Sequence, residues 1–242
     1  MDNIHALITV RMSSTRLGGK CMLLLYDGSV LEHVIKRVRA FGMIPVISTT
    51  REDWGDDSLT PIERTAKRLG VLCYCGPNED KLLRWKETCD KFNIDKFVTV
   101  DCDDPYFDDE LSRLAYDALS HADVVKPNMH AYLGSHGWAL RKSAIDKSCK
   151  TKKSSDTEMM WYHLDSSLVI VGQRPPHLRE FEQGLRLTLD YEEDYWLLKT
   201  VSRHLKFDCT RDDIVRFFEA NPGLRKINDF RNEAWKQGQE KR

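Results

Sequence analysis

The sequence has no long hydrophobic run and no excess of charge of one sign. Its apolar stretches fall well short of the roughly 18 residues that a transmembrane helix requires. The 242 residues include 37 basic and 38 acidic side chains, for a formal net charge of −1 at pH 7. Such a chain lacks the global positive field that attracts nucleic acid or anionic lipid. We therefore expect neither partner, and we expect any anionic ligand to be bound by local charge.

Three motifs of familiar catalytic or phosphate-binding chemistry are also missing. The sequence contains no Walker A pattern (Gly-x-x-x-x-Gly-Lys-Ser/Thr), no Gly-x-Gly-x-x-Gly fingerprint and no Gly-x-Ser-x-Gly nucleophile turn. These absences leave no support for a P-loop, a Rossmann phosphate site or an acyl-transfer serine.

Seven cysteines are scattered along the chain, an odd number that cannot all pair. The amino terminus lacks the pattern of an export signal, so we expect a reduced, cytoplasmic protein. Cys73 and Cys75 have no second Cys or His pair at zinc-like spacing, and we interpret both as buried core residues.

The first half of the sequence contains a regular alternation of strand-like and helix-like segments. Apolar runs predict strands at 4–10, 45–49, 71–75 and 96–100. Helical periodicity and end signals predict helices at 30–41, 60–69, 79–92 and 109–120. Four consecutive β-α units predict right-handed crossovers and an α/β fold, a three-layer α/β/α arrangement around a mostly parallel sheet.

The second half is less regular. It predicts short strands at 124–126, 138–140, 168–171 and 185–189, and helices at 191–205 and 211–220. The polar segment 147–156 is expected to be a surface loop that is either mobile or ordered over a ligand. We find no repeat or linker, and 242 residues suit one domain, 1–242.

A cationic loop follows the first predicted strand. It contains Arg11, Arg16 and Lys20, three hydroxyl side chains that include Ser13 and Ser14, and two adjacent glycines. Glycines let a backbone approach oxygen atoms, and Arg and Lys neutralise them, so this loop suits a polyphosphate.

An acidic loop follows the fourth predicted strand, at the same edge of the sheet as the cationic loop. It places Asp101, Asp103 and Asp104 within four residues. Carboxylates this close repel unless a cation or a hydrogen-bond network holds them, and oxygen ligands favour Mg²⁺. The alternative is a solvated turn in which Asp108 or Asp109 caps the next helix.

A second acidic cluster surrounds Asp190, after an apolar run and before a helix. Asp190 is a natural N-cap with Glu193 three residues later, as in a capping box. Its carboxylate is also a candidate second ligand for a metal held by Asp103.

The third predicted helix begins near the same edge. Asn78 is a candidate N-cap, Asp80 lies on the first turn, and Arg84 is placed to pair with Asp80. A capped helix explains most of this pattern, while its position also suits nucleotide binding. His136 lies between small residues, which suits either a ligand contact or a plain turn.

Four motifs together resemble one enzyme family. They are Arg11-Met12-x-Ser14-x-Arg16-Leu17-x-x-Lys20, Gly76-x-x-x-Asp80-x-x-x-Arg84, Asp103-x-Pro105 and Leu187-Thr188-Leu189-Asp190-x-x-x-Asp194. In this order they resemble the cytidylyltransferases that activate acidic sugars, above all the spore-coat polysaccharide cytidylyltransferase-like branch, and more distantly CMP-KDO and CMP-sialate synthetases.

The resemblance implies a nucleotide-diphospho-sugar transferase (GT-A-like) fold, with a nucleotide-binding half at 1–122 and an acceptor-binding and dimerisation half at 123–242. It implies that Arg11, Ser13, Ser14, Arg16 and Lys20 bind the triphosphate of CTP, with Asp80 and Arg84 also at the nucleotide. It implies Mg²⁺ as cofactor, held by Asp103 and Asp190, and a possible homodimer.

The sequence departs from the family at two positions. The family usually has Leu-Pro before the loop lysine, where this chain has Gly18-Gly19, and a glycine where Cys102 stands. We expect the first change to loosen the loop and the second to crowd the base or the acceptor. The region 126–179, where the acceptor pocket normally lies, matches poorly.

The predicted function is Mg²⁺-dependent transfer of CMP from CTP to a small acceptor, such as an acidic sugar or related metabolite, with release of pyrophosphate. Arg11, Arg16, Lys20 and Asp103 are the predicted catalytic residues. Two alternatives remain. One is a nucleotide-sugar-dependent glycosyltransferase that uses Asp101-Cys102-Asp103 as its metal motif. The other is a degenerate member that binds nucleotide without turnover.

Overall fold

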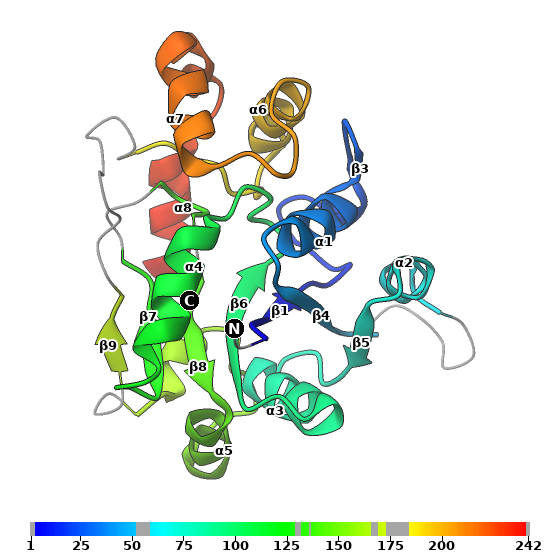
Figure 1. Cartoon of the computed structure of the whole chain (residues 1–242), viewed down its shortest axis with the longest axis vertical. Coiled ribbons are helices and arrows are strands. Elements are labelled where there is room, and N and C mark those ends of the chain that lie inside the picture. Colours follow the sequence, from blue (N-terminus) through cyan, green and yellow to red (C-terminus); the bar gives the residue numbers. More distant parts are fainter. Residues whose placement is uncertain are drawn as a thin grey trace.

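A mixed sheet forms the centre of the computed structural model, which describes residues 3–51, 59–128, 132–135, 137–165, 169–172 and 184–240 (Figure 1). Within these residues the sheet has seven strands in the order β5-β4-β1-β6-β8-β7-β9. The strands are β1 (His5–Thr9), β4 (Ile44–Thr49), β5 (Leu72–Cys75), β6 (Lys96–Asp101), β7 (Val124–Lys126), β8 (Ala139–Arg141) and β9 (Val169–Val171).

Most neighbouring strands are parallel, as predicted. β1 pairs in parallel with both β4 and β6, β4 with β5, and β7 with β9, whereas β8 is antiparallel to β6 and β7. Thr9 at the end of β1 is in register with Asp101 at the end of β6. The loops that leave these two strands therefore start side by side.

Helices cover both faces of the sheet. They are α1 (Val30–Ala40), α2 (Pro61–Leu69), α3 (Lys81–Phe92), α4 (Asp109–Ala118), α5 (Lys142–Thr151), α6 (Glu192–Ser202), α7 (Arg211–Ala220) and α8 (Arg231–Glu240). Ala6 and Ile8 of β1 point into a core shared with α1, α2, α4, α6 and α7. Leu7 points into a second core with α3 and α5. This alternation, the period of a strand, produces the predicted three layers.

Short elements complete the described chain. A hairpin of β2 (Leu24–Leu25) and β3 (Gly28–Ser29) precedes α1, and 3₁₀ turns lie at η1 (Lys20–Met22), η2 (Met160–His163) and η5 (Pro222–Ile227). No helix in the described ranges combines the length and the apolar character that crossing a membrane requires.

Three predictions for local structure were wrong. Residues 185–189 form no strand and contribute only an isolated bridge between Leu133 and Arg186. The segment 147–156 is not all loop, because α5 runs to Thr151 and buries Ile145 and Ser148 on one face. Cys73 and Cys75 are only partly buried, since β5 is an edge strand. Residue 168 of the predicted strand 168–171 lies outside the described residues.

Candidate active site

A cavity of about 1250 Å³ lies at the carboxyl ends of β1 and β6. Its walls come from the cationic loop after β1, the acidic loop after β6, the start of α3, and the segment before α6. Most of the residues predicted for the site line it: Arg11, Ser13, Ser14, Arg16, Lys20, Arg84, Asp103 and Asp190. The structure thus brings together side chains up to 179 positions apart in the sequence.

Lys20 joins the two predicted metal ligands. Its Nζ lies 2.6 Å from Asp103 Oδ2, 2.9 Å from Asp190 Oδ1 and 2.8 Å from the carbonyl oxygen of Leu189. Burial disfavours the ammonium charge, but the two carboxylates outweigh it and raise the pKa of Lys20 above its ordinary value.

A glycine shapes the loop just before Lys20. Gly19 has φ +61°, in the left-handed region that favours glycine, and it begins η1. Its N–H donates to Met12 O at 3.2 Å, and its carbonyl accepts from Met22 N at 2.9 Å. Gly19 therefore closes the loop and orients Lys20 into the cavity.

The other two cations of the loop also face acids. Arg16 Nη2 lies 2.7 Å from Asp190 Oδ1, and its guanidinium packs over the Tyr191 ring at 5.4 Å. Arg11 Nη2 lies 3.5 Å from Glu158 Oε1. All three cations of the loop are therefore paired with carboxylates, and Arg16 and Lys20 share the same oxygen of Asp190.

The acidic loop offers a set of oxygen ligands. One carboxylate oxygen each from Asp101, Asp103 and Asp104 lies within 4.8 Å of the others. Burial and the two neighbouring carboxylates raise the pKa of Asp104 well above its ordinary value, whereas Lys20 lowers that of Asp103 against the effect of burial. Three crowded carboxylate oxygens are a donor set that fits a hard divalent cation such as Mg²⁺.

The acidic loop and the Asp190 segment are tied by their backbones. The N–H of Leu189 donates to the carbonyl of Asp103 at 2.7 Å, and the N–H of Cys102 donates to Thr9 O at 3.0 Å. Cys102, the departure from the family pattern, is buried and borders the cavity.

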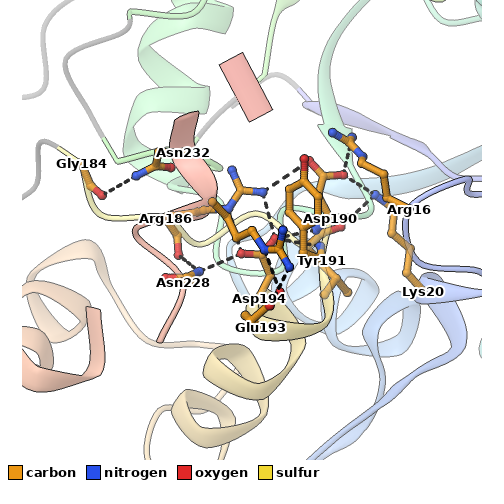
Figure 2. Close-up of polar contacts among 12 residues, drawn as sticks. Arg16, Lys20, Gly184, Arg186, Asp190, Tyr191, Glu193, Asp194, Asn228 and Asn232 are labelled. Atoms are coloured by element: carbon orange, nitrogen blue, oxygen red, sulfur yellow. Dashed lines mark hydrogen bonds and ion pairs between the residues drawn. The ribbon is translucent and has the colours of Figure 1, made fainter. Parts of the chain in front are cut away.

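Asp190 does not cap the helix after it, contrary to the prediction. The carboxylate of Asp194, the third residue of α6, accepts from the N–H groups of Asp190 and Tyr191 at 2.9 and 3.0 Å (Figure 2). Glu193 instead pairs with Arg231 at 2.7 Å. Because Asp194 does the capping, the Asp190 carboxylate faces Arg16 and Lys20.

Two residues that the sequence did not single out hold Asp194. Arg186 forms a bidentate pair with it, both bonds 2.8 Å, and Asn228 Nδ2 donates to it at 2.9 Å (Figure 2). Arg186 is fully buried, and Asn228 lies 34 positions after Asp194. The one sequence signal for this cluster was the presence of Asp194 in the fourth motif.

The start of α8 also reaches the cavity. Asn232, Trp235 and Lys236 line it, and Asn232 Nδ2 donates to Gly184 O at 3.2 Å. The sequence predicted no element beyond residue 220, so this wall was not predicted.

Asp80 has a structural role. It is the N-cap of α3, in place of Asn78, and its Oδ1 accepts from Leu83 N at 3.1 Å. The same oxygen accepts from Thr157 Oγ1 at 2.9 Å, and Oδ2 pairs with Lys152. Asp80 is absent from the cavity lining and instead anchors the segment that leads to Glu158.

Arg84 lines the cavity but does not pair with Asp80. Its Nη1 donates to the carbonyls of Pro77 and Asn78 at 2.6 and 3.1 Å. Lys81, which sequence reasoning missed, also lines the cavity, with its Nζ 3.6 Å from Asp101 Oδ1. His136 and residues 173–179 of the poorly matching region lie outside the described residues.

The chain shares its α/β fold with solved structures, among them one named a cytidylyltransferase and one named a nucleotidyl transferase. No protein-family model and no curated protein matches the chain. A cytidylyltransferase from Leptospira borgpetersenii serovar Hardjo-bovis is 24% identical, with a TM-score of 0.79 over 92% of this chain and 96% of that chain.

Two further solved structures show how widely the fold is shared. CMP:2-keto-3-deoxy-manno-octonic acid synthetase, solved with CTP, is 12% identical, with a TM-score of 0.59 over 84% of this chain and 100% of that chain. Molybdopterin-guanine dinucleotide biosynthesis protein A from Archaeoglobus fulgidus is 14% identical, with a TM-score of 0.60 over the same two shares. Proteins named for different nucleotides thus share this fold.

Proposed function

We propose that the protein is a Mg²⁺-dependent cytidylyltransferase that transfers CMP from CTP to a small acceptor and releases pyrophosphate. The observation that carries the proposal is the convergence of the cationic loop with Asp103 and Asp190 at Lys20. The likeness to solved cytidylyltransferases supports the choice of CTP.

In the proposed reaction an acceptor oxygen attacks the α-phosphorus of CTP. The bond from that phosphorus to the β-phosphate oxygen breaks, pyrophosphate leaves, and the acceptor loses a proton to solvent. This chemistry needs alignment and charge neutralisation more than a protein nucleophile. Arg11, Arg16 and Lys20 bind the triphosphate and stabilise the pyrophosphate, with Ser13 and Ser14 donating to phosphate oxygens.

Asp103 and Asp190, with Asp101 beside them, are the residues that would hold Mg²⁺. When bound there, the ion neutralises phosphate charge as a Lewis acid. We propose an acidic sugar or a related metabolite as the acceptor. Lys126 and Lys236, which also line the cavity, supply positive charge for such a ligand.

The test measures pyrophosphate release from CTP and Mg²⁺ with a panel of sugar acids and sugar phosphates. Asp103→Asn should lower turnover by at least about 10³-fold, because it removes a carboxylate at the reacting phosphates. Asp208→Asn, at an exposed aspartate outside the cavity, is the matched control. Wild-type turnover in Asp103→Asn would remove Asp103 from the site.

Companion assays, one of UDP release from UDP-sugars and one of nucleotide binding, separate the alternatives. Consumption of a UDP-sugar in place of CTP would favour the glycosyltransferase, for which the proximity of the Asp101 and Asp103 oxygens is the supporting observation. Nucleotide binding without turnover over the whole panel would favour a non-catalytic member.

A further inference from the structure

The three oxygens around Lys20 Nζ form the shell of a cation site. Two are carboxylate oxygens, from Asp103 and Asp190, and the third is the Leu189 carbonyl, all within 2.9 Å. An ammonium has three N–H donors, so these three contacts satisfy it. Carboxylate and carbonyl oxygens are also the ligands that hard divalent cations take.

The Asp190 carboxylate is already compensated in this arrangement. Arg16 contacts the same Oδ1 at 2.7 Å, and Arg186 Nη2 lies 3.6 Å from Oδ2 (Figure 2). Asp190 is thus surrounded by three cations. A divalent cation that arrives alone meets a site whose charge is neutralised and whose central position is filled.

We propose that the Lys20 ammonium is an internal cation that takes the place of the divalent metal in the ligand-free protein. It holds Asp103 and Asp190 together and blocks metal binding until a nucleotide arrives. The triphosphate then offers Lys20 new anionic partners, the ammonium moves to them, and the metal enters between the carboxylates. Metal and nucleotide therefore bind together. This inference rests on the proposed function for its choice of ligands.

The covalent geometry of lysine allows this exchange. The charge sits at the end of a flexible four-carbon stem, so it can move without a change in the backbone of the loop. Lys20 is also within the loop that borders the cavity beside Arg11 and Arg16, the other two cations proposed to bind the triphosphate.

The test measures Mn²⁺ affinity by electron paramagnetic resonance, with no nucleotide present, for wild type, Lys20→Met and Lys67→Met. The wild type and the Lys67→Met control, an exposed lysine of α2, should bind Mn²⁺ weakly. Lys20→Met should bind it at least 10-fold more tightly. A non-hydrolysable CTP analogue should then tighten Mn²⁺ binding at least 10-fold in wild type and less than 3-fold in Lys20→Met.

Unchanged or weaker Mn²⁺ binding in Lys20→Met would overturn the inference. Lys20→Gln, neutral but polar, repeats the measurement should the Met variant not fold, with circular dichroism to check both. The outcome does not depend on turnover. If Lys20→Met gains Mn²⁺ affinity but the wild type never consumes CTP, the internal-cation inference stands and the proposed enzymatic function is wrong. If the wild type consumes CTP but Lys20→Met gains no Mn²⁺ affinity, the proposed function stands and the inference is wrong.

Discussion

Asp103 and Asp190 meet at one ammonium, but the chain holds them there in different ways. Asp103 lies two residues beyond the end of β6, and neighbouring backbone fixes its position. Asp190 depends on Asp194, which in turn depends on Arg186 and on Asn228 near the C-terminus. One carboxylate is therefore placed by backbone hydrogen bonds at a strand end, which include the bond from Leu189 N–H to the Asp103 carbonyl, and the other by a buried charged cluster. We expect substitutions in the cluster that supports Asp190 to destabilise the fold, and a substitution of Asp103 to affect mainly function.

The strongest way to break this comparison is Asp194→Asn. The substitution leaves the fully buried Arg186 guanidinium with only the more distant Asp190 carboxylate, 3.6 Å away, as a charged partner, so we expect the free energy of unfolding to fall by about 3 kcal/mol. Asp103→Asn, whose side chain is 29% exposed, should cost less than about 1 kcal/mol. Urea denaturation measures both.

A double variant tests the mechanism of that loss. The variant that combines Arg186→Met with Asp194→Asn also removes the buried guanidinium charge. It should recover part of the stability lost by Asp194→Asn alone. Equal destabilisation by Asp103→Asn and Asp194→Asn would contradict the proposed difference between the ways in which Asp103 and Asp190 are held in place.

A second buried carboxylate sharpens the comparison, because it has fewer partners than Asp194. Asp108 caps α4 through Leu111 N at 3.1 Å and lies 3.1 Å from Arg211 Nε. Burial raises the pKa of Asp108 to about 6, from an ordinary 3.8. Between these values the folded state binds more protons than the unfolded state, so its stability decreases as the pH rises.

The effect should amount to about 3 kcal/mol in total between pH 3 and pH 7, at about 1.4 kcal/mol for each pKa unit, and be flat above that range. Asp108→Asn keeps an oxygen for Leu111 N and should lose this pH dependence. Denaturation curves of both proteins across the range measure the difference. Parallel curves would show that Asp108 titrates normally in the folded protein.

The smallest effect is expected at the anchor formed by Asp80. Thr157 is fully buried; its hydroxyl donates to Asp80 and accepts from Leu82 N at 2.9 Å. Thr157→Val keeps the shape and leaves the Leu82 N–H unsatisfied, so we expect a loss of about 1–2 kcal/mol. Thr151→Val, at an exposed threonine of α5, is the control and should change stability by less than about 0.5 kcal/mol. Equal losses in the two variants would remove Thr157 from the anchor.

The sequence predicted the parts of the site that local structure determines. Apolar runs and turn residues located β1 and β6, and parallel strands bring the cationic loop and the acidic loop to the same edge. Helices α1 and α2 begin within one residue of their predicted starts, and the structure shows capping boxes there at Ser29 and Thr60. Periodicity and capping rules predict only contacts between residues that are a few positions apart in the sequence.

The parts that sequence reasoning missed depend on distant partners. At the start of α6, Asp190, Glu193 and Asp194 are all plausible caps, and the choice of Asp194 is decided by Arg186 and Asn228. The family resemblance placed Asp80 at the nucleotide. The pairing of Asp80 with Thr157 and Lys152 was not predicted, because it spans more than 70 positions. Such pairs leave no periodic signal in one sequence.

The Lys20 contacts with Asp190 and Leu189 have a consequence for biosynthesis. The partners are separated by 170 and 169 positions, and the cluster that holds Asp190 needs Asn228 as well. On the ribosome, β1, β4, β5 and β6 emerge early and can pair with one another within the first 101 residues, whereas the pairing of β6 with β8 comes later. The cluster that holds Asp190 forms only after Asn228 has been synthesised, so a nascent chain that stalls earlier would carry the paired strands β5-β4-β1-β6 without the complete cavity.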